Sequence, residues 1–432
     1  MLRIASRLEE EGFETWCVGG AVRDALLGHP HLDWDLATAA RPEQVRKLFR
    51  RTVPVGIEFG TVGVLDDQGI MHEVTTFRRD VQTDGRHAVV EFGASLDEDL
   101  ARRDFTINAI AYSSSSGRLH DPFGGRRDLA DGIVRAVGSP EQRMREDRLR
   151  ALRGIRFASR FGFEIESVTW QAIVESAPSL SRLSAERVKQ EIEKTLDQVE
   201  RPSIALELWR RSGAIDVLVP ALSAVTAVTL GSLDSLPRPG PATRPARRIN
   251  RLVALFADVS PKDASRVLRA LRFANAEIRW VSEVLEGWRA IGPSVERLLL
   301  AASGGSRSEK GIDDTQIRRW VAAVGRTRLA PVLRLIAARA SAGRRLGHDA
   351  PSPSDVASLY RRAVRIAFRD AVALGDLAVD GDDLRAAGVP DGPLLGRILA
   401  LLLQRVVDDP SVNSYDTLVR IGVALHDELR ER

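Results

Sequence analysis

Two stretches near the start of the chain decide its fold: Thr15–Gly28, with the sequence TWCVGGAVRDALLG, and Asp33–Thr38, with the sequence DWDLAT. A short apolar run that ends at two glycines predicts a strand entering a tight turn, and a helix is predicted over residues 21–27. The alternation of apolar and polar residues over 32–37 predicts a second strand. Because side chains alternate across a strand, its two aspartates lie on one face. The chain therefore begins as an α+β unit that displays a pair of carboxylates.

The sequence around these stretches extends the unit. Helical spacing predicts helices over residues 1–12 and 42–49. Strands are predicted over 61–65 and 70–76, on either side of a turn that ends in glycine. Residues 78–103 are polar, and we expect them to be irregular.

Beyond about residue 138 the sequence changes character. Strand signals nearly vanish, and helical spacing dominates, beginning with one long predicted helix over 141–161. Residues 237–245 and 301–310 are predicted to be loops. We therefore expect an α+β fold, in which a small mixed sheet with flanking helices is followed by an all-α region.

The composition is that of a folded chain with an unusual basic content. The 432 residues are 44% hydrophobic and 28% charged, which provides a sizeable core and excludes disorder as the main state. Of the 63 basic residues, 58 are arginine. A GC-rich genome would produce this bias, and so would phosphate recognition, because guanidinium groups bind phosphate oxygens in pairs.

Cysteine content and hydropathy limit the location. Cys17 is the only cysteine, which excludes an intramolecular disulfide and a zinc site built on several thiolates. No stretch reaches about 18 uncharged apolar residues, and the first residues lack the features of a signal peptide. We therefore expect a cytoplasmic protein with no membrane partner.

The two glycines and the arginine that follows them suggest a phosphate ligand. Gly19 and Gly20 let the backbone approach a ligand closely. Arg23 adds a guanidinium fork for phosphate oxygens. Paired glycines are common in turns, so this pattern alone does not identify a nucleotide site.

The two aspartates of the second stretch suggest a metal ion. Asp33 and Asp35 would repel each other unless a cation lay between them. Such oxygen ligands suit Mg²⁺, which binds one or two carboxylates together with substrate phosphates. The alternative is the solvent face of an edge strand. A third carboxylate on a neighbouring strand would complete a two-metal phosphoryl-transfer site, and Glu73 is the candidate.

Five motifs in order make the sequence resemble the class II tRNA nucleotidyltransferases of the poly(A) polymerase family, the CCA-adding enzymes. The first motif combines GGAVRDALLG and DWDLAT from the two stretches above. The others are Arg102–Ala109 (RRDFTINA), Asp121–Gly125 (DPFGG), Glu146–Arg150 (EDRLR) with its continuation to Phe157, and Ser184–Val188 (SAERV).

The resemblance implies an enzyme that adds C, C and A to the 3′ end of tRNA without a template, using CTP and ATP and releasing pyrophosphate. It implies two Mg²⁺ ions held by Asp33 and Asp35. The residues expected to bind the nucleotide are Gly19, Gly20, Arg23, Arg102, Asp104, Asn108, Glu146, Asp147, Arg150, Arg153 and Arg156. The expected partner is tRNA, bound through its acceptor and T arms, and no protein partner is implied.

The third of the later motifs suggests how the base is chosen. Asp147 and Arg150 are three residues apart on the predicted long helix and would share a face. Their carboxylate and guanidinium groups match C and A, which both present an amine beside an acceptor, and do not match G or U. Glu146 would orient Arg150. The alternative for this spacing is an ordinary ion pair on a helix surface.

The same resemblance divides the chain into a nucleotidyltransferase catalytic head over 1–137, a helical neck for base recognition over 138–200, a helical body over 201–300 and a helical tail for tRNA binding over 301–432. Three alternatives remain. One is an enzyme that adds only CC or only A, and another is a poly(A) polymerase of the same family. The third, from a different class, is a non-catalytic RNA-binding protein.

Overall fold

The computed structural model describes residues 1–29, 34–83, 88–236, 244–303 and 312–430. Asp33, one of the two predicted metal ligands, lies outside these residues. The described chain forms two compact units, Met1–Ser223 and Ala224–Arg432, and each is described by itself below. The predicted division into four parts stays a prediction.

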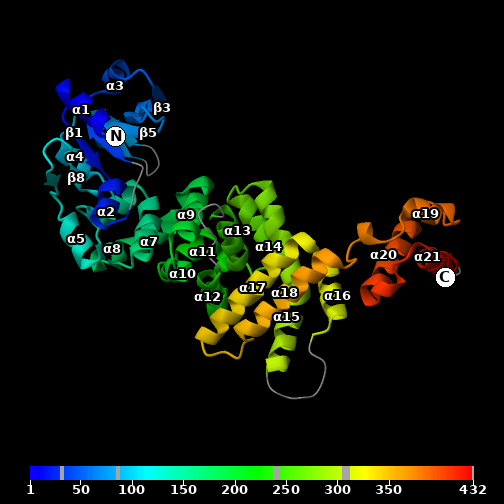
Figure 1. The fold of residues 1–432 in the computed structure, drawn as a ribbon. Helices are drawn as coiled ribbons and strands as arrows, with labels where there is room; N and C mark the ends of the chain where they lie inside the picture. The colour runs from blue at the N-terminus through cyan, green and yellow to red at the C-terminus, as the bar shows by residue number, and fades with distance from the viewer. Residues whose placement is uncertain (30–33, 84–87, 237–243, 304–311, 431–432) are drawn as a thin grey trace. The chain divides into compact units, whose positions relative to one another are not determined.

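A seven-stranded sheet forms the centre of the first unit (Figure 1). Its strands lie in the order β3-β4-β5-β2-β1-β8-β9. Their bounds in that order are Thr52–Gly56, Thr61–Leu65, Met71–Thr76, Asp35–Thr38, Thr15–Val18, Ala111–Tyr112 and Leu119–His120. Strands β2 and β5 are parallel and the other neighbours are antiparallel, so the predicted small mixed sheet is confirmed.

Helices and apolar side chains hold this sheet in place. Helix α1 (Leu2–Glu10) contacts β1 and α3 (Pro42–Leu48), and it buries Ile4 and Leu8. Helix α2 (Gly20–Leu26) follows β1 directly, as the two glycines predicted. A core cluster joins the sheet to the next helix: Val18, Ala37, Phe77, Leu96, Leu100, Ala109, Ala111 and Val137.

The prediction of irregular structure over 78–103 is wrong. Strands β6 (Arg78–Thr83) and β7 (Ala88–Phe92) form an antiparallel hairpin, and α4 (Leu96–Ala101) follows it. Polar residues hide the strand pattern of the hairpin. The helix is too short for a clear period, but Ser95 and Glu98 form the reciprocal cap that starts it.

The first unit continues mainly as helices, and one difference from the predicted helices affects the candidate site. These are α5 (Gly125–Asp131), α6 (Pro140–Glu146), α7 (Leu149–Phe161), α8 (Ser167–Ser176), α9 (Ala185–Gln198), α10 (Pro202–Arg211) and α11 (Ala214–Leu218), with β10 (Ile133–Val134) paired to β11 (Glu164–Ile165). The single helix predicted over 141–161 is two helices, because Asp147 has extended backbone angles. Its carboxylate accepts the backbone N–H of Leu149 at 3.0 Å and so caps α7.

The second unit contains helices and no strand within its described residues. They are α12 (Ala227–Ser235), α13 (Arg244–Leu255), α14 (Pro261–Ala270), α15 (Asn275–Ser303), α16 (Asp314–Val324), α17 (Arg326–Arg345), α18 (Pro353–Arg369), α19 (Gly381–Ala386), α20 (Pro393–Asp408) and α21 (Tyr415–Arg430). Helix α17 contacts α12, α13, α15, α16 and α18 and is the centre of its bundle. Helices α19, α20 and α21 share a second apolar core around Leu384, Ile398 and Leu418.

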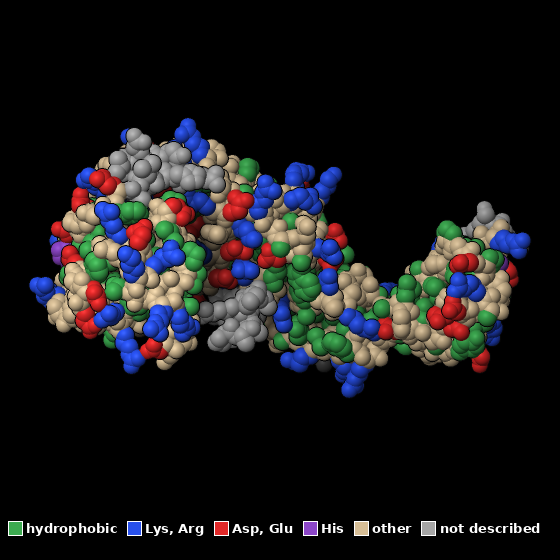
Figure 2. All heavy atoms as spheres, turned by 90° about the horizontal axis from the view of Figure 1, so that it is seen from above, with side chains coloured by type: hydrophobic (Ala, Val, Ile, Leu, Met, Phe, Trp, Pro, Cys, Tyr) green, Lys and Arg blue, Asp and Glu red, His purple; other side chains and the backbone are tan. Residues whose placement is uncertain are grey.

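The distribution of charge on the surface does not by itself indicate a binding site. Figure 2 shows Lys and Arg side chains scattered over both units, with Asp and Glu among them. None of the described helices is both long and apolar enough to cross a membrane. The roles of the arginines therefore have to be inferred from the contacts of the individual side chains.

Candidate active site

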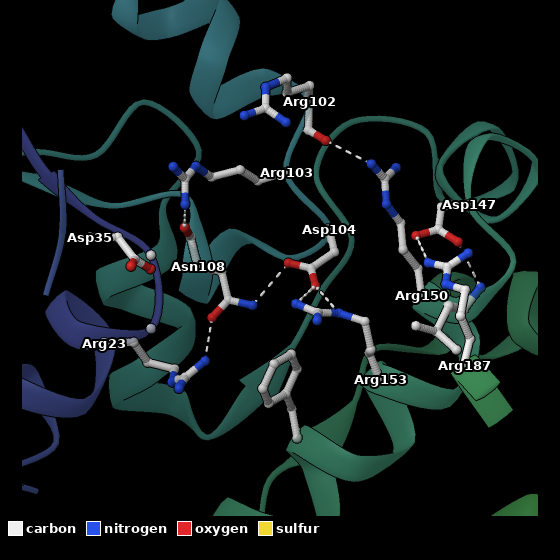
Figure 3. A pocket seen from close by; sticks show the side chains of 14 residues that line it. Arg23, Asp35, Arg102, Arg103, Asp104, Asn108, Asp147, Arg150, Arg153 and Arg187 are labelled. Atoms are coloured by element: carbon white, nitrogen blue, oxygen red, sulfur yellow. Dashed lines mark hydrogen bonds and ion pairs between the residues drawn. The ribbon is translucent and has the colours of Figure 1, made fainter. Parts of the chain in front are cut away.

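One pocket of the first unit collects most of the predicted site residues. It has a volume of about 400 Å³ and is bounded by the ends of β1 and β2, the segment after α4, and helices α7 and α9 (Figure 3). Six arginines and three aspartates are among its lining residues. The lining consists of Gly19, Gly20, Arg23, Asp35, Arg102, Arg103, Asp104, Asn108, Asp147, Leu149, Arg150, Arg153, Phe157 and Arg187. An excess of guanidinium over carboxylate groups suits a triphosphate.

Glycine is required at the corner where β1 ends. Gly19 has a φ of +77°, and a Cβ there would lie 3.0 Å from Arg103 Nη1 and 3.7 Å from Asp35 Oδ2. A side chain at this position would be strained and would also take up the space that these two groups occupy. The turn therefore keeps a carboxylate and a guanidinium close to the backbone.

The residues at this corner fit a divalent cation in part. Asp35 is the first residue of β2, and Leu36 is in register with Val74 of the parallel strand β5. Asp35 and Glu73 therefore lie at the same level on adjacent strands and on one face of the sheet. The described residues contain no group of three or more His, Cys, Asp or Glu side chains that could hold a metal, and Asp33 is not among them. The chemistry of Asp35 and its place on the strand suit Mg²⁺.

A chain of hydrogen bonds crosses the floor of the pocket (Figure 3). Arg23 donates to Asn108, whose amide nitrogen donates to Asp104 at 2.9 Å. The other carboxylate oxygen of Asp104 accepts from Arg153 Nε at 2.8 Å. Burial opposes the charge on Asp104, but Arg153 and Asn108 outweigh it and lower its pKa to about 2. Asp104 is therefore a fixed negative charge.

The Arg23 side chain is held in place by contacts within the protein. It is buried, pairs with Asp24 at 2.6 Å, and lies 4.9 Å from the ring centres of both Phe157 and Phe161. Burial lowers its pKa from the ordinary value, while Asp24 opposes that shift. The guanidinium group is thus already oriented before any ligand arrives.

Arg102 and Arg103 share one buried acid. Arg102 donates to Asp99 at 2.9 Å through Nη2, and Arg103 donates to the other oxygen of Asp99 at 3.2 Å. Asp99 is only 1% exposed. Burial alone would raise its pKa, but the two arginines lower it. The pair of guanidinium groups is therefore fixed directly after α4, in the lining of the pocket.

The other end of the pocket contains the predicted base-reading residues. Asp147 lies in the break between α6 and α7 and Arg150 lies in α7, so they meet at the pocket without sharing a continuous helix face. Asp147 accepts from Arg187 of α9 at 2.8 Å. Arg150 donates to Glu146 at 2.8 Å and to the backbone carbonyl of Arg102 at 2.8 Å.

Arg143 ties these contacts together without lining the pocket. Its Nη1 donates to the carbonyl of Ala101 at 3.0 Å, and its Nη2 donates to Glu146 at 2.6 Å. The carbonyl of Arg143 in turn accepts from Arg150 at 3.3 Å. We call the set Ala101, Arg102, Arg143, Glu146 and Arg150 the head–neck clasp. It links the segment that carries Arg102 to the helix that carries Arg150.

Three described candidates do not line the pocket. Glu146 accepts a hydrogen bond from Arg150. Glu73 lies on β5, next to Asp35 of the adjacent strand β2. Arg156 is buried between α7 and α9, where it donates to Glu191 at 2.7 Å. Asp33 is outside the described residues.

Three residues line the pocket that the sequence analysis did not name as site candidates: Leu149, Phe157 and Arg187. Arg187 belongs to the last motif quoted above, so an unassigned arginine in that motif was the available signal. Phe157 ends the third of the later motifs, and its ring supports Arg23, Arg153 and Arg156.

Comparisons with known proteins agree with this fold and pocket. A family model described as the poly A polymerase head domain matches residues 15–135. A second, described as a probable RNA and SrmB-binding site of polymerase A, matches residues 162–225. Together with the pocket, these matches define a nucleotidyltransferase.

Full-length relatives make the assignment narrower. A CCA-adding enzyme from Lactiplantibacillus plantarum is 34% identical over 428 residues, covering 96% of this chain and 93% of the relative. The Bacillus stearothermophilus CCA-adding enzyme, solved in complex with CTP, is 32% identical with a TM-score of 0.74, covering 100% of this chain and 97% of that one. The Thermotoga maritima enzyme, solved with tRNA, shares the fold at 21% identity and a TM-score of 0.66, covering 98% and 94%. The chain belongs to the CCA-adding enzyme family.

Proposed function

We propose that the pocket lined by Asp35, Asp104, Asp147 and their arginines is the site at which this chain transfers CMP and AMP to RNA. As a CCA-adding enzyme, the chain adds C, C and A to the 3′ end of tRNA and uses CTP and ATP. The observation that carries the site assignment is that one pocket holds a strand-end carboxylate at one end and an Asp–Arg pair at the other.

The carboxylate end is proposed as the metal site. Asp33 and Asp35 would hold Mg²⁺, with Glu73 as a further carboxylate on the adjacent strand. Two bound Mg²⁺ ions would supply activation of the RNA 3′-hydroxyl and neutralisation of the departing pyrophosphate. The position of Asp35 supports this proposal, because its Oδ2 lies close to the Gly19 turn, where a Cβ would be 3.7 Å away.

The triphosphate is proposed to bind the arginine wall. Arg102 and Arg103 present guanidinium groups already oriented by Asp99, and the Gly19–Gly20 backbone lets phosphate oxygens approach closely. Asp104 and Asn108 hold Arg153 and Arg23 in place and are proposed to face the sugar. Fixed guanidinium groups lose little freedom when the ligand binds.

The base is proposed to be read by Asp147 and Arg150. The carboxylate would accept from the exocyclic amine of C or A, and the guanidinium group would donate to the neighbouring acceptor. Arg187 and Glu146 hold the two side chains from behind. Because G and U present the opposite pattern at this edge, they would leave buried groups unpaired.

A location in the cytoplasm is proposed from the cysteine content. Cys17, the only cysteine, is buried in β1. Burial raises its pKa to about 11, which keeps it a thiol. A chain without disulfides and with one protected thiol suits a reducing compartment.

The experiment is incorporation of labelled CTP, ATP or both on tRNA transcripts that end before CCA, after C, and after CC. Completion of CCA on the first transcript supports the proposal. Addition of CC alone, or of A only to the transcript ending in CC, would indicate a split enzyme. A long A tail would indicate a poly(A) polymerase, and no incorporation with Mg²⁺ would indicate a non-catalytic RNA-binding protein.

A further inference from the structure

One buried aromatic ring contacts three arginines at the nucleotide pocket. Phe157 of α7 is 4% exposed. Its ring centre lies 4.9 Å from Cζ of Arg23, 5.4 Å from Cζ of Arg153 and 4.5 Å from Cζ of Arg156. At such distances the negative face of an aromatic ring attracts a guanidinium group. A single side chain therefore attracts three cations that would otherwise repel one another.

Both ends of the hydrogen-bonded chain in the pocket floor pack on this ring. The chain runs from Arg23 through Asn108 and Asp104 to Arg153, as Figure 3 shows. Arg23 belongs to α2 and Arg153 to α7, so the chain joins two helices. Since the two terminal guanidinium groups both contact Phe157, the ring closes the chain into a loop. A displacement of either cation would therefore move Asn108 and Asp104.

The ring attracts cations without adding negative charge to the pocket. Arg23 and Arg153 each pair with an aspartate as well, but a further carboxylate would cancel positive charge that a triphosphate needs. An aromatic ring stabilises a cation through its quadrupole and leaves the net charge unchanged. Arg23 and Arg156 are each 4% exposed, and this burial lowers the pKa of both. Cation–π attraction is strongest where the cation is desolvated in this way.

We propose that Phe157 is a positioning residue for the sugar of the incoming nucleotide. It acts through Arg23 and Arg153, the two ends of the chain. The middle of the chain, Asn108 and Asp104, is proposed above to face the sugar. Because a site that hydrogen-bonds a substrate hydroxyl rejects the analogue without it, the preference for CTP over dCTP depends on how precisely these two side chains are held. The inference rests on the proposed function and adds a residue that acts through others.

The first test replaces Phe157 in the full chain with mono-, di- and trifluorinated phenylalanine. Fluorine changes the size of the ring little and weakens its negative face step by step, so packing is retained while attraction for cations declines. The measurements are the Kd values of CTP and dCTP without tRNA, and kcat and KM for both nucleotides on a tRNA transcript lacking CCA. We expect the affinity for CTP to fall about tenfold over the series, and the preference for CTP over dCTP to fall about fivefold, with kcat for CTP changed less.

The matched control is the same series of substitutions at Phe77. This side chain is 1% exposed and packs in an apolar core cluster of the same unit, with Val18 and Leu100 among its members. Fluorination there should leave both nucleotide affinities as in the wild type. Phe157→Leu keeps an apolar side chain and removes the ring, and should lower the preference for CTP over dCTP about tenfold. Phe77→Leu should lower thermal stability and leave that preference unchanged.

The binding measurements separate this inference from the proposed function. If the wild type does not incorporate CMP, the proposed function fails, whereas a graded loss of CTP over dCTP affinity without tRNA still supports the role of the ring.

Four results would overturn the positioning role of Phe157. One is a preference and affinity that do not change with fluorination, and another is an equal change when Phe77 is fluorinated. The third is a loss in Phe157→Leu without any gradient in the fluorinated series, which would show that the side chain acts by shape alone. The fourth is a graded CTP affinity with an unchanged preference over dCTP, which would place the effect on the triphosphate instead of the sugar.

Discussion

Arginines have opposite surroundings in two places, the nucleotide pocket of the first unit and the surfaces of α17 and α18 in the second unit. In the nucleotide pocket, Arg102, Arg103 and Arg153 each donate to a buried aspartate. On α17 and α18, the exposed side chains of Arg334 and Arg361 have no such partner within the described chain. A paired guanidinium group is fixed before its ligand binds, whereas an exposed group without a partner retains its rotamer freedom and would lose it on binding. The difference separates precise positioning from general affinity, and composition alone cannot reveal it.

The largest effect is expected in the nucleotide pocket, where the charged side chains are held in place. Asp35→Ala should reduce kcat at least about 1,000-fold, which corresponds to about 4 kcal/mol of transition-state stabilisation. The measurement is single-turnover CMP incorporation with saturating tRNA and CTP. Asp67→Ala, an exposed aspartate of the first unit, is the control and should retain activity. Near-normal turnover of Asp35→Ala would refute its catalytic assignment.

A smaller effect is expected at the other end of the pocket. Asp147→Ala should raise UTP incorporation relative to CTP about 100-fold, because the variant no longer penalises a base that lacks the exocyclic amine. The ratio of kcat/KM values for the two nucleotides is the readout. Arg187→Ala should move the ratio in the same direction but less, since Arg187 acts through Asp147. An unchanged ratio in Asp147→Ala would contradict base reading by this residue.

The fixed charge of Asp104 predicts a pH dependence of stability. Its pKa is lowered to about 2 in the folded chain, against the ordinary value of 3.8. A depressed pKa stabilises the folded state above pH 3.8, and this contribution of about 2 kcal/mol is lost as pH falls toward 2.

The check is the difference in unfolding free energy between the wild type and Asp104→Asn. The wild type should be more stable at pH 6, and the gap should shrink as the pH is lowered to 2. Asp67→Asn, at an exposed ion pair, should show almost no gap at either pH. A gap for Asp104→Asn that is constant with pH would mean that the side chain contributes by shape alone.

The smallest expected effect concerns the head–neck clasp. Arg143→Ala removes the donor that joins the Ala101 carbonyl to Glu146, so Arg150 should be less well oriented. We expect discrimination between CTP and UTP to fall about fivefold to tenfold, with kcat on CTP changed less, because one hydrogen bond to a charged group is worth about 1.5–3 kcal/mol and part of it is recovered by relaxation.

Two further variants distinguish a positioning role of Arg143 from a simple loss of stability. Arg145→Ala, an exposed arginine of the same helix, is the matched control and should behave as the wild type. Arg143→Lys retains one donor and should recover part of the discrimination. Equal discrimination in all three variants, at equal thermal stability, would show that the clasp does not act on base choice.

The sequence predicted the parts of the fold that depend on local pattern. Strands β1, β2, β4 and β5 were found from an apolar run, from alternation or from a turn between two apolar segments. Strand β3 was missed because Val53 and Val55 are exposed and no face of the strand is strongly buried. The long helix over 141–161 was wrong because apolar spacing continues across Asp147, while the break depends on one side-chain hydrogen bond.

The residues of the candidate site also fall into two groups, those that the local sequence predicts and those that depend on tertiary packing. The motif residues of the turn, of α4's end and of α7 were predicted from their neighbours in sequence. Arg187 was not, because it reaches Asp147 from a helix 40 residues away. Arg156 was predicted with its motif, but it does not line the pocket and donates instead to Glu191 of α9. Which face of a helix meets the ligand depends on tertiary packing, which one sequence does not reveal.

One contact of the head–neck clasp bears on how the enzyme releases its product. Arg150 donates to the carbonyl of Arg102 and to Glu146. A base that takes one of these donors exchanges one hydrogen bond for another, so its net gain is about 1 kcal/mol instead of the 4–6 kcal/mol of an isolated bond. If Asp147 and Arg150 bind the base as proposed, weak retention of this kind would let the RNA terminus leave them after each addition, and the same two side chains would then be available for the next one.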